Sequence, residues 1–282
     1  MIAASDSGGG AAWREAAKLT AFLRRDFLTA WSYRLAFVSD LVNLVAQVVV
    51  FSFVSRLVDP ARVPRFGGEQ PTYLAFVVVG IAISALLQLG LNRVGSALRN
   101  EQLLGTLESL LVTPTSELTI LLGLVAYDLV YLPVQITMFL AAVTVLFGVE
   151  VHLSGIVPAA AVFAVFVPFA GGLGAASAAA VLRFRRAPVV IGLAGYGLAV
   201  GSGAYFPRDL LPGWLAGLAA SNPVAIALDA VRQVLLGGGG WAAAGPALLV
   251  LAPVSAGALA GGVWLFRLAL RAERRSGTLG QY

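Results

Sequence analysis

The sequence predicts an all-α, polytopic membrane protein with six transmembrane helices. Hydrophobic residues make up 59% of the 282 residues, and charged residues make up only 12%. A soluble domain carries about 25% charged residues, roughly twice this share. The mean hydropathy is +0.88, and apolar stretches close to the roughly 20 residues that cross a bilayer recur along the chain. Together these observations place most of the chain inside a membrane.

The six expected spans form one transmembrane domain over residues 35–270. They are Leu35–Phe53, Thr72–Leu91, Leu118–Phe147, Ile156–Leu182, Val189–Tyr205 and Ala242–Leu270. The third is long and carries Pro133 near its middle, which predicts a tilt or a kink. Glycine and alanine are concentrated in the fourth and fifth, and such small residues favour close packing between transmembrane helices.

Two segments precede the first span. Residues 1–11 are small and polar and are expected to be disordered, with no apolar stretch after them to suggest a cleaved signal peptide. Residues 12–34 predict an amphipathic helix, because Trp13, Phe27 and Trp31 share one face and Arg14 and Lys18 another. Aromatic and cationic faces of this kind suit a helix lying in the headgroup layer. The alternative is an ordinary cytosolic helix.

A second amphipathic helix is predicted over residues 99–112, between the second and third spans. At 100° per residue, its leucines fall on one face and its polar residues on the other. The leucines are Leu103, Leu104, Leu107, Leu110 and Leu111, and the opposite face holds Glu101, Gln102, Gly105, Thr106, Glu108 and Ser109. Thr113 and Pro114 are expected to end this helix and begin the next one.

The segment 206–240 is moderately apolar but interrupted by Pro207, Pro212 and Pro223. It predicts a re-entrant or externally capping pair of short helices rather than a straight span. Asp229 and Arg232 lie three residues apart, one helical turn, and are predicted to pair with each other.

The basic residues predict the orientation. With the N-terminus inside, 14 of the 19 Lys and Arg residues fall in the inner segments, including those of the basic tail, 271–282. Because positive charge concentrates on the cytoplasmic side, both termini are expected there. The expected location is the inner (plasma) membrane, crossed several times. The basic residues are scattered between apolar runs, which disfavours a nucleic-acid partner.

Several chemistries are excluded or disfavoured. The chain has no cysteine and a single histidine, His152, which leaves no thiolate metal site and no histidine cluster. Lys18 is its only lysine, so the phosphate-binding pattern G-x-x-x-x-G-K-[ST] cannot occur. No catalytic residue, metal or cofactor is assigned to this chain, and it is not expected to be an enzyme.

Polar residues inside the spans are the candidate translocation pathway. Asp40, Asn43 and Gln47 recur at helical spacing in the first span, and Asp128 and Gln135 lie seven apart in the third. Polar and ionisable groups at this depth usually face a cavity or a partner helix. For the amides, hydrogen bonding between helices is the equally supported alternative.

The chain resembles the ABC-2-type export permeases, the membrane subunits of ATP-binding-cassette exporters. The resemblance is carried by "NEQLLGTLESLLVTPTSELTILLG", by "RRDFLTAWSYRLAF" before the first span, and by the segment that begins "GAYFPRDLLPGW". It covers nearly the whole chain, and the wording "GTLESLLVTP" is similar to drug and lipid exporters. The external positions that it marks are Tyr205, Phe206 and Pro207, with Asp229 and Arg232 further along.

The resemblance implies roles for the two amphipathic helices. The helix 12–34 would be an interface helix, and 99–112 a cytoplasmic coupling helix whose polar face contacts a separate ATPase while its leucines hold it against the permease. The matching coupling positions are Glu101, Gly105, Thr106, Leu107, Glu108, Leu110, Leu111 and Pro114.

It also implies partners and a function. The partners are two copies of an ATPase subunit that binds ATP and Mg, and a second permease copy, expected as a homodimer with a heterodimer as the alternative. The expected function is export of a hydrophobic or amphipathic compound, such as a drug, lipid or natural product. The alternatives are export of a glycolipid or polysaccharide, and an ATP-independent secondary transporter.

Overall fold

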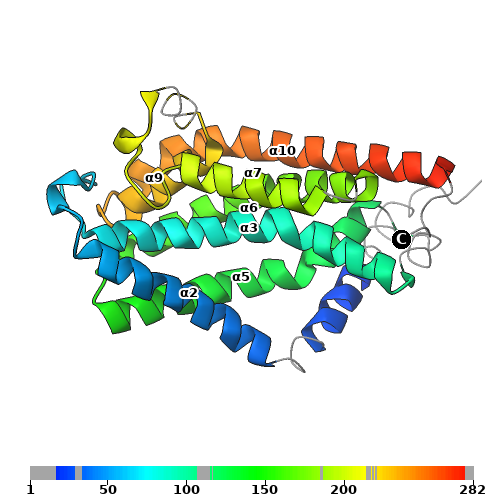
Figure 1. The fold of residues 1–282 in the computed structure, drawn as a ribbon, viewed down its shortest axis with the longest axis horizontal. Coiled ribbons are helices and arrows are strands. Elements are labelled where there is room, and N and C mark those ends of the chain that lie inside the picture. The colour runs from blue at the N-terminus through cyan, green and yellow to red at the C-terminus, as the bar shows by residue number, and fades with distance from the viewer. Residues whose placement is uncertain are drawn as a thin grey trace, which may run out of the picture.

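The computed structural model describes residues 17–28, 34–106, 115, 117–184, 187–213, 217, 219 and 221–276. A helix over 17–28 is followed by α2 (Arg34–Ser55), α3 (Tyr73–Leu103), α5 (Glu117–Phe147), α6 (Ile156–Arg183), α7 (Ala187–Gly201), α9 (Pro223–Leu235) and α10 (Gly240–Ser276). The long helices run roughly side by side (Figure 1). Within the described ranges, β-structure is limited to one isolated bridge between Phe66 and Glu69. The all-α class is confirmed.

In the described part of the chain, five helices are long and apolar enough to cross a membrane, namely α2, α3, α5, α6 and α10. The fifth predicted span, Val189–Tyr205, is shorter than expected, because α7 has only 15 residues. At 1.5 Å per residue it is about 22 Å long, less than the roughly 30 Å of a hydrocarbon core. The chain turns after Gly201, and Gly203 has φ 76°. Five helices of the described residues therefore reach the length of a span, and the sixth expected span, at α7, is not confirmed.

Helix α3 also differs from the prediction. It runs unbroken for 31 residues, from Tyr73 to Leu103, past the predicted end of the second span at Leu91. Residues 99–103 therefore belong to α3 and do not begin a separate amphipathic helix. The chain leaves the helix at Gly105, whose φ of 69° is in the left-handed region that favours glycine.

Glycine brings α6 into backbone contact with two neighbours. A Cβ on Gly262 of α10 would lie 2.0 Å from the carbonyl oxygen of Gly172 in α6. A Cβ on Gly174 of α6 would lie 2.2 Å from the carbonyl oxygen of Gly90 in α3. Such close approach is possible only without side chains. We call α3, α6 and α10 the body of the molecule, and α2, α5 and α7 the wall.

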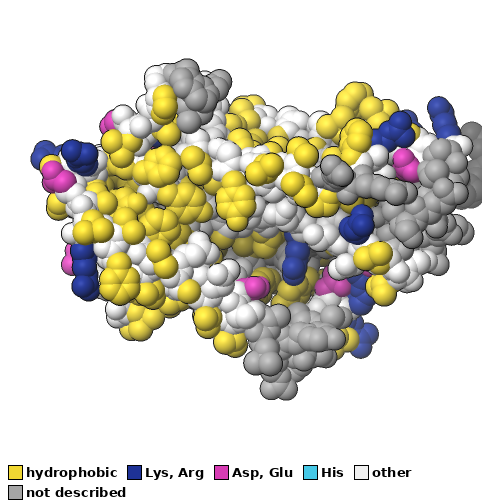
Figure 2. Space-filling model, in the orientation of Figure 1, with side chains coloured by type: hydrophobic (Ala, Val, Ile, Leu, Met, Phe, Trp, Pro, Cys, Tyr) yellow, Lys and Arg dark blue, Asp and Glu magenta, His cyan; other side chains and the backbone are white. Residues whose placement is uncertain are grey.

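The helices define two ends. At one end, on the left in Figure 1, α9 and the connection from α2 to α3 lie together; this is the α9 end. At the other end lie the helix 17–28, the last turns of α3 and the C-terminal part of α10; this is the Glu101 end. Figure 2 shows apolar side chains over the middle of this face and charged side chains mainly toward the two ends. This distribution suits a protein whose middle lies in lipid.

Candidate functional site

A cavity of about 680 Å³ lies between α3 and the wall helices α2, α5 and α7. This volume is in the range of pockets that hold drug-sized molecules, about 300–1,000 Å³. Figure 2 shows this face of the molecule hollowed beneath α3. The lining residues are Asp40, Asn43, Leu44, Gln47, Ile81, Ser84, Ala85, Gln88, Leu89, Asn92, Arg93, Ser96, Tyr131, Gln135, Tyr196 and Tyr205.

Helical periodicity places these residues on the cavity side. In α2, polar positions recur at intervals of three and four residues from Asp40 to Gln47. In α3, Ser84, Gln88 and Asn92 lie four residues apart, so they form a column along one face. The Asn92 amide donates to the Gln88 side-chain oxygen at 2.9 Å. Each helix therefore turns a polar stripe toward the same space.

The structure brings together four of the five predicted pathway residues. Asp40, Asn43, Gln47 and Gln135 all line the cavity. The fifth, Asp128, lies in α5, but its side chain is outside the described part of the structure. The polar face of α2 and one position of α5 that the sequence indicated thus border one cavity.

Other lining residues were not singled out from the sequence. In the sequence, Tyr131 and Tyr196 cannot be told from tyrosines that lie at a membrane surface. Only the four-residue spacing of Ser84 from Gln88 indicated that Ser84 faces the cavity. The Ser84 side chain is buried, and its hydroxyl has no hydrogen-bond partner among the described residues. Arg93 was assigned to the inner charge count only, yet it also lines the cavity.

Tyr205 closes the cavity at the α9 end. Its ring stacks on that of Phe51 in α2, with centroids 5.6 Å apart and planes 10° from parallel. Its carbonyl oxygen accepts a hydrogen bond from the Tyr73 hydroxyl of α3 at 2.8 Å. Phe206 and Pro207 follow it, and Pro207 precedes a short 3-10 turn, Arg208–Leu210. Of the predicted external positions, Tyr205 is the one that lines the cavity in the described structure.

Arg232 of α9 fastens this closure to α3. Its side chain is buried, and its guanidinium carbon lies 3.4 Å from the centroid of the Phe76 ring. The Nε and Nη2 groups donate to the Phe76 carbonyl oxygen at 3.2 and 3.0 Å. Nη2 also lies within 3.1 Å of the Gly203 carbonyl oxygen and 3.0 Å of that of Ala204. One guanidinium thus joins α3, α9 and the turn after α7.

A close backbone approach makes this arrangement possible. A Cβ on Gly80 of α3 would lie 1.8 Å from the Ala204 carbonyl oxygen. Any larger residue at position 80 would push the turn after α7 away from α3 and out of reach of Arg232. Gly80 therefore positions the cavity closure through the backbone alone.

The direct partners of Asp229 and Arg232 differ from the predicted pairing of the two with each other. Asp229 forms an ion pair with Arg208, in the 3-10 turn, while Arg232 is satisfied by backbone carbonyls. Three-residue spacing within a helix allows a pair, but here each side chain has a better-placed partner in another segment. The described part of the predicted segment 206–240 includes this turn and α9, which Asn222 caps by accepting from the Val224 amide at 3.0 Å.

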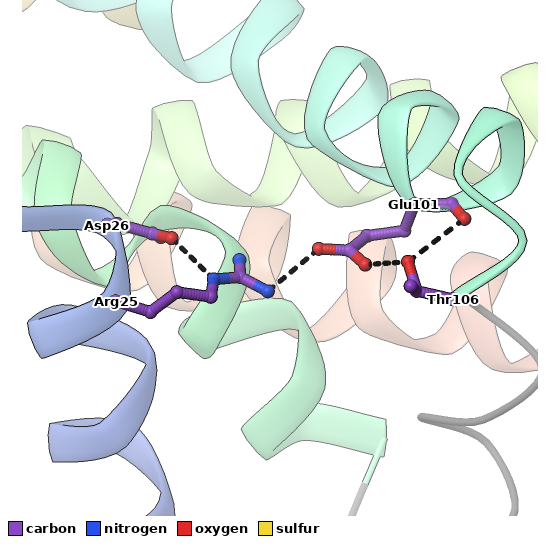
Figure 3. Close-up of polar contacts among 4 residues, drawn as sticks. All are labelled: Arg25, Asp26, Glu101 and Thr106. Carbon is purple, nitrogen blue, oxygen red and sulfur yellow. Dashed lines mark hydrogen bonds and ion pairs between the residues drawn. The ribbon is translucent and has the colours of Figure 1, made fainter. Parts of the chain in front are cut away.

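A second polar cluster lies at the Glu101 end (Figure 3). Glu101 is buried, and its carboxylate accepts a hydrogen bond from Arg25 Nη1 at 2.9 Å and another from the Thr106 hydroxyl. Arg25 Nε donates to Asp26 at 2.8 Å. Burial lowers the pKa of Arg25, but the carboxylates of Asp26 and Glu101 outweigh this and raise it. The cluster joins the helix 17–28 to the turn that ends α3.

The predicted burial is reversed at Glu101, Leu103 and Leu104, whereas Gly105 and Thr106, also placed on the polar face, are exposed. Glu101 was placed on the outward polar face and Leu103 and Leu104 on the packing face. The structure buries Glu101 and exposes both leucines, at 67% and 73%. The reason is that residues 99–103 continue α3, whose register faces Glu101 toward Arg25. The remaining coupling positions Leu107, Glu108, Leu110, Leu111 and Pro114 lie outside the described residues.

The helix 17–28 occupies part of the predicted interface helix, residues 12–34. It packs Phe22 against α5, where a Cβ on Gly123 would lie 2.6 Å from the Phe22 ring. Trp13 and Trp31 lie outside the described residues. The helix therefore contacts both α3, through Arg25, and α5, through Phe22, at the Glu101 end.

Two comparisons with known proteins bear on this arrangement. A search of curated proteins found no match to the sequence. A family model described as "ABC-2 type transporter" matches residues 17–236. The matched region includes the helix 17–28, the wall, the cavity and the whole of α9, and it ends before α10.

Proposed function

Because the chain belongs to the ABC-2 type transporter family, we propose that it is the membrane subunit of an ATP-driven exporter. The family domain is a membrane transport component rather than a catalytic domain, and such domains typically work with ABC ATPase partners. In our proposal the complex moves a hydrophobic or amphipathic compound out of the cytoplasm. A separate ATPase subunit binds ATP and Mg and hydrolyses the nucleotide.

The observation that carries this proposal is the cavity. Intramembrane polar groups are costly in lipid and therefore usually line a pathway or contact a partner. Here residues predicted on that ground, among them Asn43, Gln47 and Gln135, converge from two separate helices on one space of about 680 Å³. Export then proceeds from the Glu101 end, which we assign to the cytoplasm with both termini, to the α9 end.

We further propose that two copies of this chain associate with two ATPase subunits. The wall helix α2 exposes large apolar side chains, including Val42, Val50 and Phe53. In a dimer with the pathway at its centre, such a face would pack on lipid or on the second copy. The alternative is a heterodimer with a different permease chain. Identifying the subunits of the purified complex would distinguish it from a homodimer.

The ATPase contact is proposed at the turn after α3. Leu103, Leu104 and Gly105 are exposed there, and Thr106 is held by Glu101. Glu101, which the sequence placed on the surface facing the ATPase, instead supports the coupling segment through its hydrogen bond with Thr106. The exposed leucines and the residues that follow Thr106 would then be the contact surface.

Reconstitution tests the function. The permease and its ATPase are placed together in inside-out vesicles, and uptake of a panel of labelled amphipathic compounds is measured with ATP. The control carries an ATPase that binds but does not hydrolyse ATP. Uptake that needs hydrolysis and both subunits supports the proposal. Equal uptake by the permease alone, with or without ATP, would show an ATP-independent transporter instead.

A pair of neighbouring variants connects transport to the cavity. Asn43→Leu removes a cavity amide, whereas Val42→Leu changes an exposed residue beside it that is absent from the lining. We expect the first to lower ATP-dependent uptake at least several-fold and the second to leave it unchanged. If both variants transport normally, the pathway lies elsewhere.

A further inference from the structure

The hydrogen-bonding groups of the cavity are unusual in being mostly uncharged. Five amide side chains line it, from α2, α3 and α5: Asn43, Gln47, Gln88, Asn92 and Gln135. A carboxamide offers two donors and an acceptor without a net charge. These amides therefore can make many hydrogen bonds while adding no charge of their own.

Several of these groups have no protein partner. Within the described part of the chain, the side chains of Asn43, Gln47 and Gln135 make no hydrogen bond to protein atoms. The buried Ser84 hydroxyl is likewise without one. A polar group left unpaired in a membrane protein costs free energy unless water or a ligand satisfies it. These four groups are thus available to a molecule in the cavity.

The charges of the lining balance. Asp40 is the only acidic and Arg93 the only basic residue among the described lining residues. Because these two charges sum to zero, a head group with a net charge would leave the occupied cavity with a net charge, which is costly at membrane depth. An uncharged head group has no such cost.

The spacing of the groups and the remaining lining define the rest of the ligand. From Ser84 to Asn92 the column on α3 covers eight residues, about 12 Å. Several hydroxyl or amide groups on one molecule fit such a column. Leu44, Ile81 and Leu89 supply apolar surface in the same cavity, which suits a hydrocarbon part.

A neighbouring cavity shows that this lining is local. A cavity of about 280 Å³ lies between α5 and α6 and is lined almost entirely by apolar residues such as Leu132, Ile136 and Phe163. The same helix α5 therefore turns Gln135 to one side and hydrocarbon to the other. Of these two cavities, the one that we assign to transport carries the polar lining.

We propose that the transported compound is amphipathic, with an uncharged head group that carries several hydroxyl or amide groups. That this compound is transported rests on the proposed function. That the cavity prefers an uncharged head group does not depend on transport. Head groups with a net positive or negative charge are disfavoured.

Binding to the permease alone tests this preference. The chain is placed in phosphatidylcholine nanodiscs and titrated with three fluorescent probes that share one alkyl tail. The heads are maltoside, trimethylammonium and sulfate. We expect the maltoside probe to bind at least about tenfold more tightly than either charged probe. Equal or tighter binding of a charged probe would overturn the proposal.

Two variants locate the preference in the cavity. Gln47→Met removes an amide and keeps a long, unbranched side chain, and Leu44→Met is its control on the same face of α2. Gln47→Met should weaken maltoside binding about tenfold and leave the charged probes within twofold, and Leu44→Met should change neither. Gln135→Met repeats the test on α5 and should give the same result. If the glutamine variants keep the full discrimination while monodisperse on gel filtration, the inference is wrong.

The outcomes separate this inference from the proposed function. Tight maltoside binding without ATP-driven uptake of any compound would contradict the exporter and leave the head-group preference standing. ATP-driven uptake restricted to charged compounds would support the exporter and contradict the head-group preference.

Discussion

Helices α6 and α10 approach each other backbone to backbone, whereas α2 touches the rest of the described chain through a few side chains. The first contact depends on Gly172 and Gly262, which leave no room for a Cβ. In α2, only Leu44 and Val48 are buried among the described side chains. Segments with few buried apolar contacts open at lower cost than a packed core. We therefore expect the contact between α6 and α10 to stay fixed and α2, beside the cavity, to separate from its neighbours at lower cost.

The largest expected effect comes from breaking the body. In Gly262→Ala, the new Cβ would sit 2.0 Å from the Gly172 carbonyl oxygen, so the two helices must separate. We expect a loss of about 3 kcal/mol or more, at the upper end for overpacked cores, measured as thermal unfolding of the purified permease. Gly261→Ala is the matched control, since nothing lies within 4 Å of its Cβ position. A similar loss in both variants would contradict close packing at this point.

The second effect comes from releasing the cavity closure at the α9 end. Arg232→Met leaves the carbonyls of Phe76, Gly203 and Ala204 without their donor. Losing a buried charged donor costs about 3 kcal/mol, again read as unfolding. Arg208→Met breaks a partly exposed pair with Asp229, so about 1 kcal/mol is expected. Arg232→Lys should fall between them because an ammonium lacks the planar fork.

The two arginines also give a test of partnership. Asp229→Ala should cost about as much as Arg208→Met, and the double variant should cost little more than either single one. If Asp229→Ala instead loses as much unfolding free energy as Arg232→Met, and the losses of these two are not additive in their double variant, then Asp229 and Arg232 are the true pair.

The smallest effect on stability is expected at the Glu101 end. Glu101→Gln removes the charge that Arg25 meets but leaves an acceptor for Thr106. Because the Arg25 side chain is about half exposed, the loss should be about 0.5–1 kcal/mol. ATP hydrolysis by the assembled complex should fall much more than this, since the turn at Gly105 loses its support. Arg25→Ala should reproduce the defect, and Arg24→Ala, its exposed neighbour, should not. Equal behaviour of the two arginine variants would remove Glu101 from the coupling proposal.

Patterns within a single helix were predicted well from the sequence. Asp40, Asn43 and Gln47 recur at helical spacing in an apolar run, and lipid leaves such a stripe few other places to face. The structure places all three at the cavity. The class of fold followed from composition for the same reason, because hydrocarbon admits few backbone arrangements.

Features that depend on distant segments were not predictable in this way. The partner of Arg232 is set by where the turn after α7 meets α3, which no local spacing encodes. The burial of Glu101 depends on α3 continuing to Leu103 and on Arg25 from a separate helix. Helix α7 ends at Gly201 and the chain turns at Gly203 while the sequence remains apolar, so hydropathy alone placed the end of the fifth span too late.

The position of Arg232 in the chain has a consequence for biosynthesis. Its acceptors belong to Phe76, Gly203 and Ala204, and all three leave the ribosome before Arg232 does. A guanidinium inserted ahead of its acceptors would be costly to hold in lipid. Here the receiving oxygens can already be in place when the cation arrives, so the docking of α9 can accompany synthesis. A circularly permuted chain that began at α9 would reverse this order and present the cation first.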